Sequence, residues 1–259
     1  MDVVVCIKQV PDSWAEKQLS PGDLTLDRAS AEAVLNDLDE YAVEAALQLV
    51  EAHGGQVTVL TMGPDRAGEA IRKALSMGPD AGVHVVDDAL HGSDALATSA
   101  VLATALGTLT WDLVLLGCES TDARMSVIPA MLAERLGRPQ LTYAATLAVD
   151  GSTVTAERQT ETGIEVLRAE LPAVVSLVEK ANEPRYPSFK NIMAAKKKPV
   201  TTLTLADLGI DPAQVGLSAA WSRVEDAEKR PPKPPGVRIT DEGDGGRKLV
   251  EYLVSQQLV

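Results

Sequence analysis

The stretch DLVLLGCESTDARMSVIPAMLAERLG, residues 112–137, contains the unit from which we predict the fold. Residues 113–116 are all apolar, which is typical of a strand that is buried on both faces of a sheet. A polar loop over residues 117–126 follows, and a helix around Pro129 then ends at Gly137. A strand, a loop and a helix in this order are the repeating unit of a parallel sheet covered by helices.

The same unit occurs three more times toward the N-terminus. Apolar runs at 3–7, 57–60 and 83–86 predict buried strands, and each is followed by a stretch with apolar residues at helical spacing. The first of these helices is expected to begin at Asn36 or Asp37, either of which suits an N-cap. Strands that alternate with helices predict right-handed crossovers and a doubly wound, mostly parallel α/β sheet.

The pattern changes after residue 140. Residues 141–149, 153–160 and 164–171 alternate apolar and polar side chains and are separated by glycine-containing turns, so we expect an antiparallel β meander. A further apolar run, 172–178, predicts another buried strand. We therefore divide the chain into an α/β domain over residues 1–189 and an extended C-terminal arm over 190–259. The arm carries the proline-rich stretch EKRPPKPPG and is expected to pack on something outside the domain.

Composition excludes several classes of protein. The net charge of −13 is uneven, because residues 1–189 carry −15 and residues 190–259 carry +2. An acidic surface repels phosphates, which argues against nucleic-acid binding. The sequence contains no apolar run of about 18 residues and no recognisable signal peptide, so we expect no membrane insertion and a cytoplasmic location. The cysteines, Cys6 and Cys118, lie on separate apolar segments and are expected to be reduced core thiols.

A ligand site is expected at one edge of the sheet. In open α/β sheets, ligands bind beyond the carboxyl ends of the strands, where the strand order reverses. Four loops qualify by position: those after Ile7, before Asn36, after Leu60 and after Leu116. The last is the richest, because it combines Gly117, hydroxyl side chains and a helix N-terminus, which suits a phosphate. Motifs of nucleophilic, metal or P-loop enzymes are absent, so catalysis is poorly supported.

Several segments together resemble the β subunit of electron-transfer flavoprotein. They are VCIKQVPD, the helix at 36–46, IRKALSMGPD at 71–80, DLVLLGCESTDARMS with PAMLAERLG, LPAVVS and, above all, NEPRYPSFKNIMAAKKK at 182–198. The resemblance implies an adenine-nucleotide-binding α/β domain of the adenine-nucleotide α-hydrolase-like type that pairs with an α subunit. It implies AMP in the β subunit and FAD held mainly by the α subunit. The heterodimer is expected to carry electrons from flavoprotein dehydrogenases, such as the acyl-CoA dehydrogenases of fatty acid β-oxidation, to a membrane quinone reductase.

The resemblance also assigns nucleotide contacts, position by position. They are Cys6, Asn36, Asp37, Leu38, Asp39, Met62, Gly117, Cys118, Glu119, Ser120, Thr121, Asp122, Ala123, Arg124, Met125, Ser126, Val127 and Ile128. The family version of the last loop is rich in Asp and ends in Asn-Gln-Thr, whereas this loop has one aspartate, Asp122, and ends in Ser-Val-Ile. Backbone N–H groups and Ser126 are therefore the expected phosphate contacts.

The segment at 182–198 is implied to be a recognition loop for the dehydrogenase partner. The residues expected to dock are Tyr186, Phe189, Lys190, Ile192, Met193, Lys196, Lys197 and Lys198. Phe189, the single phenylalanine of the chain, occupies the anchor position. The lysines are expected either to favour an acidic partner or to stabilise the base of the loop. The alternative is that the ring of Phe189 packs back onto its own sheet.

Three other functions remain open at this point. The chain could be a stand-alone ATP-binding regulatory module of similar topology, or a nucleotide hydrolase. In bifurcating members of the family, a second FAD takes the place of AMP. We expect an electron carrier and not an enzyme, with residues 190–259 wrapping the α subunit.

Overall fold

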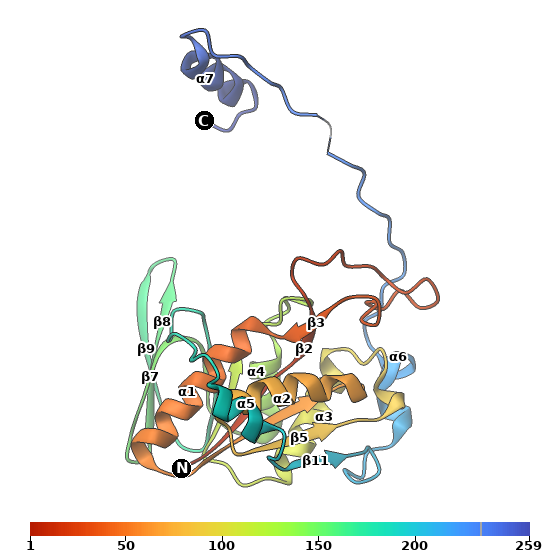
Figure 1. Cartoon of the computed structure of the whole chain (residues 1–259), viewed down its shortest axis with the longest axis vertical. Coiled ribbons are helices and arrows are strands. Elements are labelled where there is room, and N and C mark those ends of the chain that lie inside the picture. The colour runs from red at the N-terminus through yellow and green to blue at the C-terminus, as the bar shows by residue number, and fades with distance from the viewer. Residues whose placement is uncertain (234) are drawn as a thin grey trace. The chain divides into compact units, whose positions relative to one another are not determined.

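The computed structural model describes residues 1–233 and 235–259. Within these residues the main sheet has nine strands in the order β11-β5-β4-β1-β6-β10-β7-β8-β9. Figure 1 labels β7, β8 and β9 at one end of this sheet and β5 and β11 toward the other. The alternating half comprises β1 (Asp2–Cys6), α1 (Asp37–His53), β4 (Gln56–Met62), α2 (Gly68–Met77), β5 (Ala81–Val85), α3 (Ala95–Gly107), β6 (Leu113–Gly117) and α4 (Ile128–Leu136). These strands pair in parallel, which confirms the predicted doubly wound α/β class.

The two faces of the sheet carry different helices because successive strand side chains point in opposite directions. Val3 and Val5 of β1 belong to the hydrophobic cluster that includes buried residues of α1 and α2. Val4 and Cys6 belong to a second cluster that includes residues of α3 and α4. Both sets are almost fully buried, which explains why the strand sequences are apolar throughout and do not alternate.

The predicted meander is present. It consists of β7 (Gln140–Asp150), β8 (Thr153–Thr160) and β9 (Gly163–Glu170), which pair antiparallel in this order. The strand β10 (Ala173–Leu177) lies between β6 and β7 and is parallel to both, so it joins the meander to the central sheet.

Some elements were not expected from the sequence. A two-stranded antiparallel ribbon forms from β2 (Gln9–Pro11) and β3 (Ala33–Leu35), in segments whose pattern suggested a loop. The strand β11 (Val200–Leu203) pairs in parallel with β5 at the edge of the sheet. The remaining short elements are the helices α5 (Phe189–Ala195) and α6 (Gly216–Ala219) and the 3-10 turns η1 (Asp65–Ala67), η2 (Asp88–Leu90) and η3 (Pro212–Gln214). A strand of four half-exposed residues gives little periodicity, which is why β11 escaped prediction.

The chain divides into two compact units, Met1–Glu225 and Asp226–Val259. The first unit thus extends beyond residue 189, where the sequence suggested that the arm begins. The second unit contains α7 (Gly245–Ser255), whose Leu249, Val250 and Val254 side chains are each more than half exposed. Among the described residues, no helix is both long and apolar enough to cross a membrane.

Candidate functional site

The strand order reverses at β1, which lies between β4 and β6. The chain runs from β1 outward through β4 to β5 and then crosses to β6 on the other side. Because β1, β4 and β6 are parallel, the loops that follow them leave from the same edge of the sheet. The N-terminus of α1 lies at this edge as well, since it contacts residues that follow β1 and the last residue of β6.

Asp39 of α1 connects two of these loops. One carboxylate oxygen, Oδ2, accepts a hydrogen bond from the Lys8 backbone N–H at 2.8 Å, and Oδ1 accepts one from Gly117 N–H at 3.1 Å. The side chain is buried, and burial raises the pKa of Asp39 to about 7. The family resemblance assigned Asp39 to the nucleotide; in the structure its carboxylate oxygens accept hydrogen bonds from the protein's own backbone.

The close approach of α1 to β6 depends on Gly117. A Cβ atom at this position would lie 2.6 Å from Oδ1 of Asp39 and 2.8 Å from the backbone carbon of Leu38. Both distances are shorter than van der Waals contact allows. Gly117 is therefore needed for packing, in addition to the backbone approach to a ligand for which the sequence nominated it.

Asn36 holds the loop after β6 in place. It occupies the N-cap position of α1, as expected, but its side chain makes no capping bond. Instead, Nδ2 donates to the Glu119 carbonyl at 3.0 Å and Oδ1 accepts from the Thr121 N–H at 3.0 Å. The Asn36 side chain is fully buried between the helix and the loop. The first turn of α1 is thus left without a side-chain cap while the loop is fixed.

An ion triad, Lys8–Asp122–Arg28, involves the same loop; the Asp122 side chain is fully buried, whereas those of Lys8 and Arg28 are each more than one-third exposed. Asp122 Oδ1 is 2.9 Å from Lys8 Nζ, and Oδ2 is 2.6 Å from Arg28 Nη2. Burial alone would raise the pKa of Asp122, but the charges of Lys8 and Arg28 hold it well below its usual range. Burial and the nearby guanidinium lower the pKa of Lys8. Arg28 Nη1 is buried and has no hydrogen-bond partner among the described residues.

Lys8 and Arg28 were missed by the sequence analysis. Lys8 stands directly after the first strand, within VCIKQVPD, and this position was the available signal. Arg28 lies in a polar stretch without periodicity, so nothing in its local sequence indicated a partner 94 residues away.

The outer part of the loop is exposed. Ala123, Arg124 and Met125 form its tip, and both Arg124 (φ 50°) and Ser126 (φ 58°) adopt left-handed backbone angles. The Ser126 hydroxyl donates to the Glu119 carboxylate at 2.9 Å. Residues 127 and 128 lead into α4, which has Pro129 in its first turn. The loop therefore has a fixed inner half and a strained, accessible outer half.

The other assigned nucleotide residues lie around this edge. Met62 is half-buried at the end of β4, Leu38 is half-buried, and Asp37 is exposed at the start of α1. Cys6 and Cys118 are free, buried thiols, as predicted. Burial raises the pKa of Cys118 to about 11 and raises that of Cys6 further, so neither is a thiolate near neutral pH.

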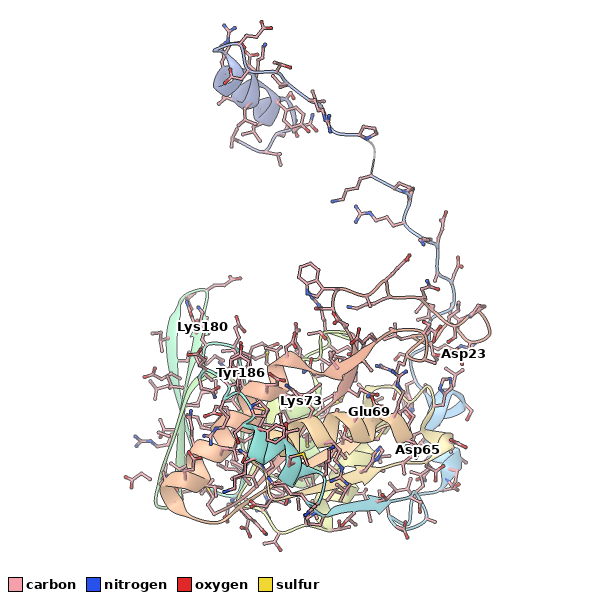
Figure 2. All side chains as sticks on the ribbon, in the orientation of Figure 1. Asp23, Asp65, Glu69, Lys73, Lys180 and Tyr186 are labelled. Carbon is pink, nitrogen blue, oxygen red and sulfur yellow. The ribbon has the colours of Figure 1, made fainter. Side chains whose placement is uncertain are left out.

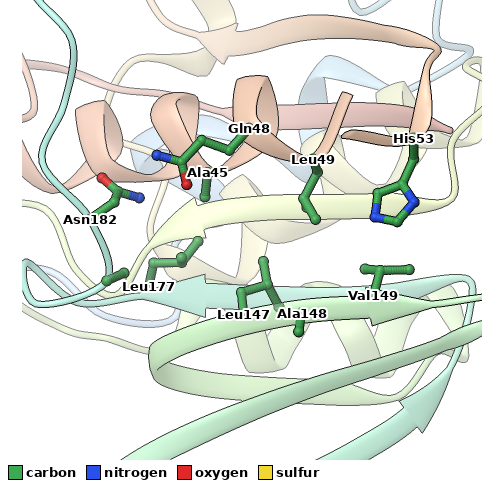
Figure 3. Close-up of a pocket in the computed structure, with 10 residues that line it drawn as sticks. Ala45, Gln48, Leu49, His53, Leu147, Ala148, Val149, Leu177 and Asn182 are labelled. Atoms are coloured by element: carbon green, nitrogen blue, oxygen red, sulfur yellow. The ribbon is translucent and has the colours of Figure 1, made fainter. Parts of the chain in front are cut away.

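Two cavities lie beside α1, away from the loop after β6. One, of about 270 Å³, separates α1 from the meander, with Asn182 at one end and His53 at the other (Figure 3). The second, of about 350 Å³, lies among α1, α2 and the β2–β3 ribbon. Residues 117–128 line neither cavity.

The predicted docking segment presents its apolar side chains to solvent. Tyr186 is 95% exposed and Phe189, the first residue of α5, is 80% exposed. Ile192 and Met193 are nearly half exposed. Figure 2 shows Tyr186 on the side of the molecule that carries α1 and α5. The alternative in which Phe189 packs onto its own sheet does not occur.

The lysines of this segment differ in their surroundings. Lys190, Lys196 and Lys197 are exposed. Lys198 Nζ instead donates to the carbonyls of Leu75 at 3.0 Å and Gly78 at 2.8 Å, at the C-terminus of α2. Of the two roles expected for the lysines, the geometry of Lys198 matches the stabilisation of the loop base.

The raised pKa of Asp39 predicts a pH dependence of stability. The folded pKa of about 7 lies above the ordinary value of 3.8, so the folded protein retains a proton that the unfolded chain releases. The contribution of Asp39 to stability is therefore complete below pH 4 and is lost as the pH rises toward 7, by up to about 4 kcal/mol. Urea unfolding between pH 4.5 and 7.5 measures this slope. Asp39→Asn should flatten it, and equal slopes in variant and wild type would contradict the assignment.

The fold and the loop cluster define the class of protein: a doubly wound α/β domain with a cluster of loops at the switch point of the sheet, where ligands bind in open sheets of this kind. A family model described as "Electron transfer flavoprotein domain" matches residues 23–208. The chain belongs to this family, as the sequence predicted.

Several proteins whose names refer to electron transfer flavoprotein are similar in sequence to this chain over its full length or nearly so. Two are named electron transfer flavoprotein subunit beta. The protein from Mycobacterium leprae is 55% identical over all of this chain and 99% of its own length, and that from Megasphaera elsdenii is 35% identical over the whole of both. The caffeyl-CoA reductase-Etf complex subunit CarD of Acetobacterium woodii is 36% identical over 99% of this chain and 97% of its own length.

Proposed function

We propose that the chain works as the β subunit of a heterodimeric electron carrier, with FAD held mainly by the α subunit. The observation that carries this proposal is the similarity, over the full chain, to proteins named electron transfer flavoprotein subunit beta. The complex would accept electrons from flavoprotein dehydrogenases, such as acyl-CoA dehydrogenases, and deliver them to a membrane quinone reductase. The location would be cytoplasmic, and the chain itself would catalyse no reaction.

AMP is the proposed ligand of the switch-point edge, where it would have a structural role. The residues there suit an adenylate. The Asn36 side chain fixes the backbone of residues 119–121, and the loop ends at the N-terminus of α4, where free N–H groups favour a phosphate. The unpartnered, buried Nη1 of Arg28 adds a cationic donor beside Asp122 of the same loop. Residues 117–128 would hold the phosphate through backbone N–H groups and Ser126.

A second FAD in place of AMP is the competing ligand. Both nucleotides contain adenylate, so the same loop contacts would serve either one.

The exposed segment that contains Tyr186 and Phe189 is the proposed dock for the dehydrogenase. Burial of one phenylalanine ring contributes roughly 1.5–3 kcal/mol. Electron transfer needs brief encounters, and a small apolar patch dissociates faster than a large interface. Exposed Lys190, Lys196 and Lys197 would favour an acidic partner surface.

The C-terminal arm is the proposed contact with the α subunit. In the second compact unit, Leu249, Val250 and Val254 of α7 are each more than half exposed. A helix with this much exposed apolar surface is stabilised when a partner covers it.

Co-expression with the α subunit tests this function. We expect a yellow 1:1 complex that releases one FAD and one AMP per heterodimer when it is denatured and its nucleotides are identified by mass. Release of two FAD molecules and no AMP would replace AMP with the second flavin. A colourless homodimer that hydrolyses ATP would overturn the proposal.

A further inference from the structure

The segment 182–198, which carries the proposed docking residues, is tied to the first unit at both of its ends. Near its start, Asn182 Nδ2 donates to the Tyr41 carbonyl of α1 at 2.9 Å. Three residues later, Arg185 bonds two glutamates of the same helix. These contacts join residues that are 134 to 141 positions apart in the chain.

Arg185 makes the most extensive of these contacts. Its Nε donates to Glu44 Oε2 at 2.7 Å and its Nη2 donates to Glu44 Oε1 at 3.0 Å, which is a bidentate pair. Nη1 and Nη2 also donate to the two carboxylate oxygens of Glu51. The backbone N–H of Arg185 donates to Glu44 Oε2 as well, at 3.2 Å. The pair therefore fixes the backbone immediately before Tyr186.

Burial makes this pairing strong at Glu44. Its side chain is only 5% exposed, whereas that of Glu51 is 59% exposed. Burial alone would raise the pKa of Glu44, but the hydrogen bonds from Arg185 lower it below its ordinary value. Hydrogen bonds to Glu51 and Glu44 raise the pKa of Arg185. The Glu44 carboxylate is thus ionised at neutral pH and retains Arg185.

The other end of the segment is fastened by a reciprocal pair of contacts with α2. Arg72 Nη1 donates to the carbonyls of Ala195 at 2.8 Å and Lys198 at 2.9 Å, which are free at the C-terminus of α5. Lys198 in turn donates to the carbonyls of Leu75 and Gly78 at the C-terminus of α2. Each cation satisfies the carbonyls at the end of the other helix.

Between these two ends, the backbone is ordered and the apolar side chains are exposed. Ser188 caps α5 by accepting a hydrogen bond from Asn191 N–H at 3.1 Å. Tyr186 and Phe189 on either side of this cap are 95% and 80% exposed. The segment thus displays its rings from a backbone that is already in a defined conformation.

We propose that Arg185 is a positioning residue for docking: by clamping the segment onto Glu44 and Glu51, it holds Phe189 outward before the partner arrives. The inference rests on the proposed docking function. Ordering a loop on binding reduces affinity, so a loop that is ordered beforehand binds more tightly. All but one of the side-chain N–H donors of Arg185 are engaged with the two glutamates. The guanidinium therefore has no pair of free N–H groups with which to bind a partner carboxylate in a bidentate manner.

The test uses the purified heterodimer and an acyl-CoA dehydrogenase reduced by its acyl-CoA substrate. The rate of electron transfer is measured against the concentration of the heterodimer. Arg185→Gln is expected to raise KM about fivefold or more and to leave kcat and the bound nucleotide unchanged. Glu51→Gln should raise KM about twofold. Because Glu51 is largely exposed, this variant should fold normally, so the test remains valid even if Arg185→Gln misfolds.

A matched control and a double variant separate positioning from other roles. Arg158→Gln removes the same charge from an exposed pair with Glu165 on the meander, and it should leave KM unchanged. In the Arg185→Gln background, Phe189→Ala should raise KM by a smaller factor than in the wild type, because the ring is no longer held in place.

The outcomes are distinguishable. Equal factors for Phe189→Ala in both backgrounds would show that Arg185 acts independently of the ring and would overturn the inference. So would an unchanged KM in the folded Arg185 and Glu51 variants when Phe189→Ala raises KM. If Phe189→Ala itself leaves the wild-type KM unchanged, the proposed docking function fails together with the inference.

Discussion

Replacement of Phe189 by alanine is expected to lower kcat/KM for electron uptake from the dehydrogenase by about 10- to 100-fold. The ring is 80% exposed in the free chain, so its removal takes away little packing within the protein. On docking, the ring would lose most of its contact with water, which is worth roughly 1.5–3 kcal/mol, and each 1.4 kcal/mol corresponds to about a factor of ten. Stopped-flow reduction of the heterodimer by a reduced acyl-CoA dehydrogenase measures the effect. Thermal unfolding and nucleotide content should match the wild type.

Ile164→Ala is the matched control for this prediction. Ile164 is 70% exposed, but it lies in β9 of the meander and not in the docking segment. Its removal should leave electron uptake unchanged. Equal rates for wild type and Phe189→Ala would discard the anchor role, and an equal loss in both variants would show that exposed apolar side chains act without regard to position.

Replacement of Gly117 by alanine is expected to destabilise the fold by about 3 kcal/mol and to release most of the nucleotide that we propose binds at this edge. The new methyl group would lie 2.6 Å from Oδ1 of Asp39 and 2.8 Å from the backbone carbon of Leu38. The Leu38 atom belongs to the backbone, and Oδ1 of Asp39 is held by the hydrogen bond from Gly117 N–H, so relief requires α1 to move away from β6. That movement would separate Asn36 from the loop at 119–121. Urea unfolding and extraction of the bound nucleotide measure the two effects.

Gly107→Ala provides the comparison for this substitution. Gly107 is the last residue of α3, is exposed, and has no atom within 4 Å of the position that a Cβ would take. Alanine is a better helix former than glycine, so this change should be neutral or stabilise by up to about 1 kcal/mol. A Gly117→Ala variant that is as stable as Gly107→Ala and retains its nucleotide would contradict the close packing of α1 on β6.

The central strands were predictable because each one is a mostly apolar run, with Thr58 and His84 as the polar residues within them. Residues 3–7 and 113–116 are buried throughout and 57–60 and 83–86 are mostly buried, and the strands β1, β4, β5 and β6 lie at these positions. The ribbon of β2 and β3 was not predictable, because three-residue strands carry no period. The edge strand β11 was missed for the same reason, because it is half exposed and only four residues long. Short strands form where folding brings a second segment with free backbone groups alongside, and that partner is known only from the fold.

The candidate site was partly predictable. The topological rule for parallel sheets nominated the loops after β1, β4 and β6, and the structure brings the first and third together through Asp39. The rule gave no information about Lys8 and Arg28, whose partner Asp122 is 114 and 94 residues away. The same holds for Arg185 and Glu44, which are separated by 141 residues.

The amino-acid sequence by itself determined the alternation of strands and helices, the family and the segment that bears the lone phenylalanine, because each of these is written in local spacing and residue type. Only the tertiary structure decided that Asn36 holds a loop and does not cap its own helix, that Asp122 is buried between two cations, and that Arg185 fastens the segment 182–198 to α1. The physical reason is that a side chain's partner depends on where the folded backbone brings distant residues together, and on which polar groups burial leaves without water.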